Sequence, residues 1–167
     1  NKAVFGSKPI NAYSGWYGSI SLNTSGNISR SNHIMVNPKI KVKNTGDVFV
    51  CTSDHAARNI LIGAYNKTSG WKYNTTVIKG GADRVEGFSV NDANEFFVTG
   101  SLVDTAVING TQILPLLGEF KQKLVSSYVL KTDVASKVNW FTLNSDTYIH
   151  DIECTENGNA YLVGKLD

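Results

Sequence analysis

The sequence has few of the residues from which metal and redox sites are usually built. Its 167 residues contain two cysteines, Cys51 and Cys154, and three histidines. The cysteines form no Cys-x-x-Cys spacing, and the histidines form no His-x-His or His-Glu-x-x-His pattern. Zinc knuckles and dithiol redox motifs are therefore excluded. We expect two buried thiols, no metal and no cofactor.

Long apolar runs and clustered charge are also missing. No run approaches the roughly 20 apolar residues that span a bilayer, so we expect no membrane insertion. Lys and Arg number 16 against 14 Asp and Glu, and the lysines are scattered, which argues against a nucleic-acid partner. No Gly-x-Ser-x-Gly elbow or complete phosphate-binding loop occurs. The 41% hydrophobic content nevertheless suffices for a core, either of one compact domain or of a piece of a longer one.

The residues that are present form an internal repeat. One unit is a short strand, a polar turn and an aromatic strand. Its three copies pair 39–42 with 48–51, 85–90 with 96–100, and 148–154 with 160–164. The turns are rich in Asn, Asp and Gly, which supply the positive φ that short hairpin connections need.

A second unit alternates with the first and also predicts a hairpin. Its copies pair 17–22 with 28 onward, 60–65 with 71–78, and 127–130 with 138–143. Every predicted strand is rich in β-branched and aromatic residues, and no long segment has helical periodicity. The sequence therefore predicts an all-β fold.

The repeat spacing is that of β-propeller blades, each with four antiparallel strands. The turn positions Gly46, Asn94 and Gly158 lie 48 and 64 residues apart, which is one blade per period. We expect the end of a first blade in 1–36, a second blade in 37–80, and a third in 81–145 with an inserted hairpin at 104–123. Residues 146–167 would begin a further blade.

The repeat resembles a known family. The segments 129–133 with Trp140, 157–164, and 105–111 followed by 113–114 are similar to the SBBP-type bacterial β-propeller repeats. The pattern departs from that family where Cys51-Thr52 replaces Thr-Gly. This resemblance implies a scaffold of secreted or surface proteins, mostly without assigned chemistry.

About three blades do not close a ring, because propellers usually have four to eight. Three alternatives remain open at this stage. The chain is a segment of a longer propeller, or two copies close one ring, or the fold is an open sandwich. The expected partner is accordingly a protein, either further blades of a longer chain or a second copy, or else a glycan.

Catalytic candidates are few. His150, Asp151 and Glu153 could supply acid/base groups at a blade edge. Exposed polar residues at a strand edge are the more ordinary interpretation of the same pattern.

Binding candidates are apolar or aromatic and lie outside the repeat. Two groups qualify, an aromatic group in a Gly/Ser-rich stretch and an apolar group in the insertion. They are Tyr13, Trp16 and Tyr17, and Ile113, Leu114, Leu116 and Leu117.

These observations predict a non-catalytic scaffold for protein or glycan binding, or for assembly. The location would be extracellular, on a cell surface or on a virus particle, and five Asn-x-Ser/Thr sequons agree with that setting. One alternative is a lyase or hydrolase with its site in the propeller mouth. Another is a purely structural component of a virion or appendage.

Overall fold

The computed structural model of the chain describes most, not all, of the sequence. The described residues are 2–5, 8–11, 18–22, 28–54, 56–66, 69–116, 125–133, 135, 137–145 and 147–166, with side chains described from residue 38 on except at 65, 70–74 and 166. The strands are β1 (Lys2–Phe5), β2 (Lys8–Asn11), β3 (Gly18–Leu22), β4 (Ile28–Val42), β5 (Val48–Asp54), β6 (Asn59–Asn66), β7 (Gly70–Ile78), β8 (Ala82–Val90), β9 (Phe96–Leu102), β10 (Ala106–Ile108), β11 (Thr111–Ile113), β12 (Ser126–Thr132), β13 (Val138–Asn144), β14 (Thr147–Cys154) and β15 (Ala160–Leu166).

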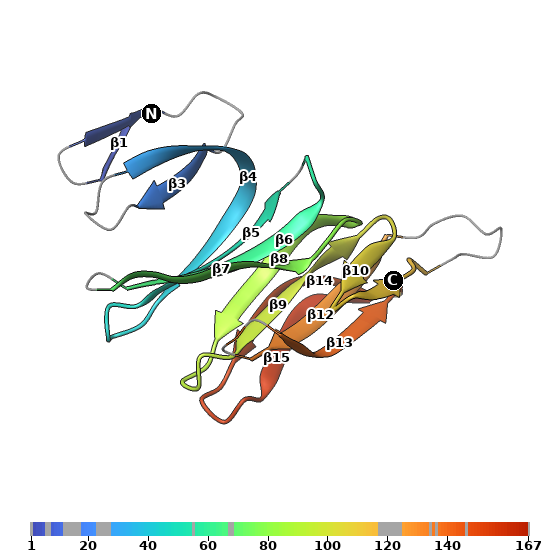
Figure 1. Cartoon of the computed structure of the whole chain (residues 1–167). Coiled ribbons are helices and arrows are strands. Elements are labelled where there is room, and N and C mark those ends of the chain that lie inside the picture. Colours follow the sequence, from blue (N-terminus) through green and yellow to red (C-terminus); the bar gives the residue numbers. More distant parts are fainter. Residues whose placement is uncertain are drawn as a thin grey trace.

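Two larger antiparallel sheets and a two-stranded C-terminal sheet follow one another along the chain (Figure 1). The first sheet has the order β3-β4-β5-β6-β7, and the middle sheet has the order β13-β12-β9-β8. Strands β14 and β15 form a C-terminal hairpin, and β1–β2 and β10–β11 are two smaller hairpins. The described residues contain no helix. The predicted all-β class is confirmed, and none of these sheets is closed.

The hairpins β4–β5, β8–β9 and β14–β15 share one turn geometry. In each, a backbone N–H before the turn donates to the carbonyl four residues on. The donor and acceptor pairs are Lys43 and Asp47 at 3.0 Å, Asn91 and Glu95 at 3.2 Å, and Thr155 and Asn159 at 2.9 Å. The third turn residue has a left-handed φ each time, +81° at Gly46, +62° at Asn94 and +80° at Gly158. The predicted repeat of this hairpin is therefore confirmed residue by residue.

Each sheet stacks on the next. Strand β8 lies against β4, β5 and β6, and β14 lies against β8, β9 and β12. All seven residues of β9 are buried, because neighbouring sheets cover both faces of the middle sheet. Phe96 belongs to the core shared with the first sheet, where its ring lies 5.6 Å from that of Phe49. Phe97 points the other way, into a smaller core with Ile149 and Ile152.

Within the predicted insertion 104–123, β10 and β11 form a hairpin that joins two sheets. Ala106 and Ile108 are buried in the larger core, and β10 pairs with the end of the first sheet through two backbone hydrogen bonds between Lys79 and Val107. At its tip, the Asn109 side chain donates to the Val138 carbonyl at 2.6 Å and accepts from the Val138 N–H at 3.3 Å. The hairpin is thereby attached to both the first and the middle sheet.

Candidate functional site

Strands β4, β8 and β14, one from each of three sheets, contribute to one polar cluster. Lys41 of β4 donates to Glu153 of β14 at 2.7 Å, and the Ser89 hydroxyl of β8 donates to the other Glu153 oxygen at 3.0 Å. These residues occupy the same repeat position, since 41, 89 and 153 are separated by the same 48 and 64 residues as the turns. The ion pair is exposed and contributes little stability. The ion pair is informative about the fold, because it shows that equivalent positions of three sheets lie close together.

Two lysines contact the turn between β8 and β9. Lys43 donates to the Asn91 carbonyl and to the Asn94 side chain, each at 2.7 Å, and so links the first hairpin turn to the second. Lys131 of β12 lies 2.8 Å from the Glu95 carboxylate. The hydrogen bonds that Glu95 accepts from Lys131 and then Asn91 lower the pKa of its carboxyl.

A second polar group lies further along β8 and β14. The Tyr148 hydroxyl donates to Glu86, and Arg84 pairs with the same carboxylate at 2.7 Å. The Arg84 guanidinium lies 5.8 Å from the centre of the Tyr148 ring, and His150 contacts that ring edge-on at 4.6 Å. Donation to Glu86 raises the pKa of Tyr148 above its ordinary value of 10.0, with burial as the next cause. Tyr148 is therefore a neutral donor and not a base at neutral pH.

The three catalytic candidates lie together on β14 but are occupied by structural contacts. Exposed His150 packs on Tyr148, and Asp151 accepts the N–H of Ile152 at 2.9 Å. Glu153 is held by Lys41 and Ser89. None of the three lines either of the two hollows described in this molecule. Glu153 therefore joins three strands, whereas His150 and Asp151 contact neighbours within β14 itself.

The predicted binding residues differ in their burial. Ile113 packs against the larger core, whereas the side chain of Leu114 is 65% exposed. Leu116 is half-buried, and its N–H donates to the Ser126 hydroxyl at 3.3 Å. Leu117, Tyr13, Trp16 and Tyr17 lie outside the described residues.

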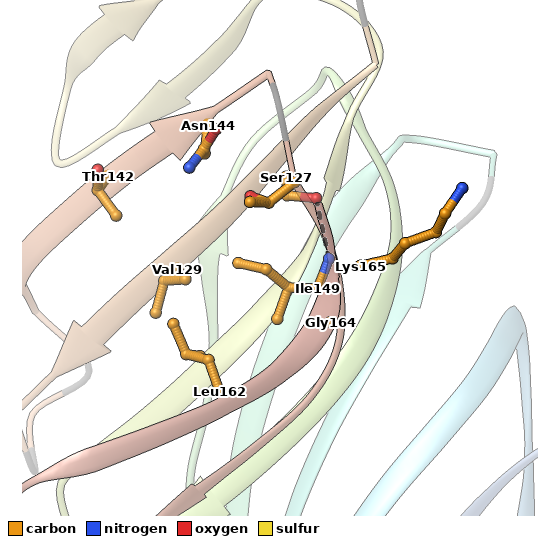
Figure 2. Close-up of a pocket in the computed structure, with 9 residues that line it drawn as sticks. Ser127, Val129, Thr142, Asn144, Ile149, Leu162, Gly164 and Lys165 are labelled. Carbon is orange, nitrogen blue, oxygen red and sulfur yellow. Dashed lines mark hydrogen bonds between the residues drawn. The ribbon is translucent and has the colours of Figure 1, made fainter. Parts of the chain in front are cut away.

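The larger hollow lies between the middle sheet and the C-terminal hairpin (Figure 2). It has a volume of about 300 Å³, and its lining comes from β12, β13, β14 and β15. Apolar side chains form much of the lining, while the Lys165 amine points away from the other residues. The lining residues are Ser127, Val129, Thr142, Asn144, Thr147, Ile149, Leu162, Gly164 and Lys165.

Two hydroxyl groups that line this hollow differ in their hydrogen bonding. The Ser127 hydroxyl accepts the N–H of Ile149 at 3.3 Å, which joins β12 to β14 across the sheets. The Thr147 hydroxyl is buried with no hydrogen-bond partner among the described residues. Sequence reasoning missed the hollow because four separate strands line it. The sequence did contain one indication of the hollow. Residues 146–167 predict only the first two strands of a four-stranded unit, which leaves space beside them.

Cys51 is buried as predicted, whereas the prediction of a buried Cys154 is wrong, because that side chain is only partly buried. Burial raises the pKa of Cys51 far above its ordinary value. Burial also raises the pKa of Cys154, more than a hydrogen bond with Ser89 lowers it. Both are therefore thiols at neutral pH and poor nucleophiles.

Neither a cluster of metal ligands nor a membrane-spanning helix is found in the part of the chain that the structure describes. There, no three His, Cys, Asp or Glu side chains gather as a metal site would require. No described helix has the length and hydrophobicity to cross a membrane. No protein-family model matches the sequence, and no curated protein shows significant similarity to it.

Proposed function

We propose that the chain is a run of consecutive β-propeller blades, similar to SBBP repeats, that acts as a non-catalytic scaffold for assembly and for protein or glycan binding. The observation that carries the proposal is the convergence of positions 41, 89 and 153. In a propeller, the first strand of every blade lines the central axis, so equivalent residues of successive blades become neighbours. The face-to-face stacking of successive sheets supports the same arrangement.

A scaffold fits the chemistry of the surface better than an enzyme does. Of the candidate acid/base groups, Glu153 is held between strands by Lys41 and Ser89, while His150 and Asp151 contact residues of their own strand. The molecule instead exposes large apolar side chains at both ends of the stack, among them Ile40 and Tyr161. Exposed apolar surface of this kind is typical of association. An extracellular, cell-surface or virion location accords with the sequons, although the Asn109 amide is already bonded to Val138.

Zero-length cross-linking tests the blade arrangement. A carbodiimide joins an amine and a carboxylate only where they are in contact, so it should form an amide between Lys41 and Glu153, identified by peptide mass spectrometry. Lys131 and Glu95, which lie 2.8 Å apart in the middle sheet, form the matched internal control. Lys41→Arg, which keeps the charge but cannot form this product, should lose the first cross-link and retain the second. If the control cross-link forms in the unmodified chain and the Lys41–Glu153 product does not, the convergence of the sheets is wrong.

A further inference from the structure

The edge of β15 has room for another strand. Among the described residues β15 pairs only with β14, whereas its repeat equivalents β5 and β9 each pair with a further strand across seven residues. Those third strands are β6 and β12. By the same repeat, an antiparallel strand of about seven residues fits along 160–166.

The hollow of Figure 2 lies where that strand would pack. Leu162 lines it and is 48% exposed, although Val98, its equivalent on β9, is fully buried beneath β12 and the first sheet. The difference arises because β9 has a neighbouring strand at its edge and β15 has none in the described structure. A strand seated beside β15 would cover Leu162 and fill the hollow.

The outer faces of the stack also expose residues whose repeat equivalents are buried between sheets. Two repeat positions allow the faces of the sheets to be compared. The rear position is the aromatic residue on the second strand of each hairpin, and the front position is the apolar residue on the first strand. The rear residues are Phe49, Phe97 and Tyr161, and the front residues are Ile40, Phe88 and Ile152. Phe49 shares one core with Phe88, and Phe97 shares the other with Ile152.

The remaining rear residue, Tyr161, and the remaining front residue, Ile40, share no such core among the described residues. Tyr161 is 63% exposed at one end of the stack, and Ile40 is 58% exposed at the other. A rear and a front residue therefore share a core at each of two places in the chain, and one further residue of each kind is exposed at an end of the stack.

The described chain also contains a hairpin that would complete the C-terminal sheet. Strand β3 pairs with the first half of β4, while the second half of β4 pairs with β5. The β3–β4 pair is thus the third and fourth strand of a repeat unit, with β3 at the sheet edge. It lies at the opposite end of the molecule from β15 (Figure 1).

We propose that a second copy of the chain docks on β15, with its β3–β4 hairpin completing the sheet begun by β14 and β15. Tyr161 of one copy and Ile40 of the next then share a core, as Phe49 does with Phe88 and Phe97 does with Ile152 within the chain. The contact is head to tail, so two copies close into a ring of six sheets through two identical junctions. This inference rests on the proposed function, because it takes the sheets to be consecutive blades.

The test is the solution mass of the 167-residue chain, measured by light scattering on a sizing column at two concentrations. The expected mass is twice the 18.2 kDa of one chain. Tyr161→Lys and Ile40→Lys each place a charge in both junctions, so each should raise the dissociation concentration roughly tenfold or more. Val125→Lys, an equally exposed position outside the proposed junction, is the control and should leave the dimer intact.

Mixing the two lysine variants distinguishes a head-to-tail contact from other kinds of dimer. The pair retains one unaltered junction, Tyr161 from one copy against Ile40 from the other, so an equimolar mixture should contain more dimer than either variant alone. A monomer at both concentrations would overturn the proposal, and so would a dimer that both variants leave unchanged. If the Lys41–Glu153 cross-link still forms within such a monomer, only the second copy is refuted and the blade arrangement stands.

Discussion

At the scale of single residues, one backbone conformation recurs at Gly46, Asn94 and Gly158. All three have a left-handed φ at the same place in the same turn. Glycine adopts this conformation freely and asparagine tolerates it, whereas other residues incur a cost of about 1–2 kcal/mol. The turn therefore selects residue type by backbone geometry and not by contact, since a Cβ on Gly46 would have no atom within 4 Å.

The first prediction compares two substitutions at this open position. Gly46→Asn should change the free energy of unfolding by less than about 0.5 kcal/mol, because Asn94 already fills the equivalent site. Gly46→Val should cost about 1–2 kcal/mol, because a β-branched side chain opposes a left-handed φ. Urea unfolding measures both. Equal stability of the two variants would show that the left-handed turn is wrong.

The second prediction concerns acid stability. Because Lys131 and Asn91 lower the pKa of Glu95, its carboxylate stabilises the fold above the ordinary pKa of 4.5. That contribution is lost as the pH falls through the lowered value. Lys131→Met should therefore reduce the loss of melting temperature between pH 6 and pH 3, and Glu156→Gln, at an exposed turn position, should leave it unchanged. An identical acid profile for Lys131→Met and the unmodified chain would contradict this assignment.

At the scale of elements, local sequence determines the hairpins well. The turn residues Asn44 to Asp47 and the alternating strands around them predict β5 and the end of β4 at 39–42, and two further copies repeat the pattern. The structure joins 39–42 and the strand predicted from 28 onward into one strand, β4. The absence of helix from the described residues also follows from local sequence, because no segment has helical periodicity.

What the sequence could not predict depends on contacts between sheets. The convergence of Lys41, Ser89 and Glu153 requires three sheets to be stacked, which no single hairpin specifies. The pairing of Val107 with Lys79 likewise joins segments that only the folded chain brings together. The aromatic candidates Tyr13 and Trp16 stay predictions, because they lie outside the described residues.

The third prediction concerns the attachment of the β10–β11 hairpin. Asn109 combines a left-handed φ of +50° with two hydrogen bonds to Val138. Asn109→Gly removes only the bonds and should cost about 1–2 kcal/mol, whereas Asn109→Ala adds backbone strain and should cost more. Thermal unfolding ranks the two. The assignment fails if alanine is the better tolerated substitution.

At the scale of the whole molecule, the described chain is a stack with two unlike open ends. Strand β9 of the middle sheet is covered on both faces, and the outer sheets each expose apolar side chains at one end of the stack. Because the exposed rear position at Tyr161 matches the exposed front position at Ile40, the ends are complementary to each other and not to themselves. Such a contact either closes a ring or extends into a filament. Six sheets lie within the range in which propellers close.

The most direct test of this account is amide hydrogen exchange along β15, measured at a low and a high protein concentration. Strand β9 is the internal reference, because β8 and β12 pair with its two edges in a single chain. The account predicts that β9 is protected at both concentrations, while the amides of β15 that do not bond to β14 become protected only at the higher one. Protection of those amides that is independent of concentration would contradict the docking of a second copy at this edge.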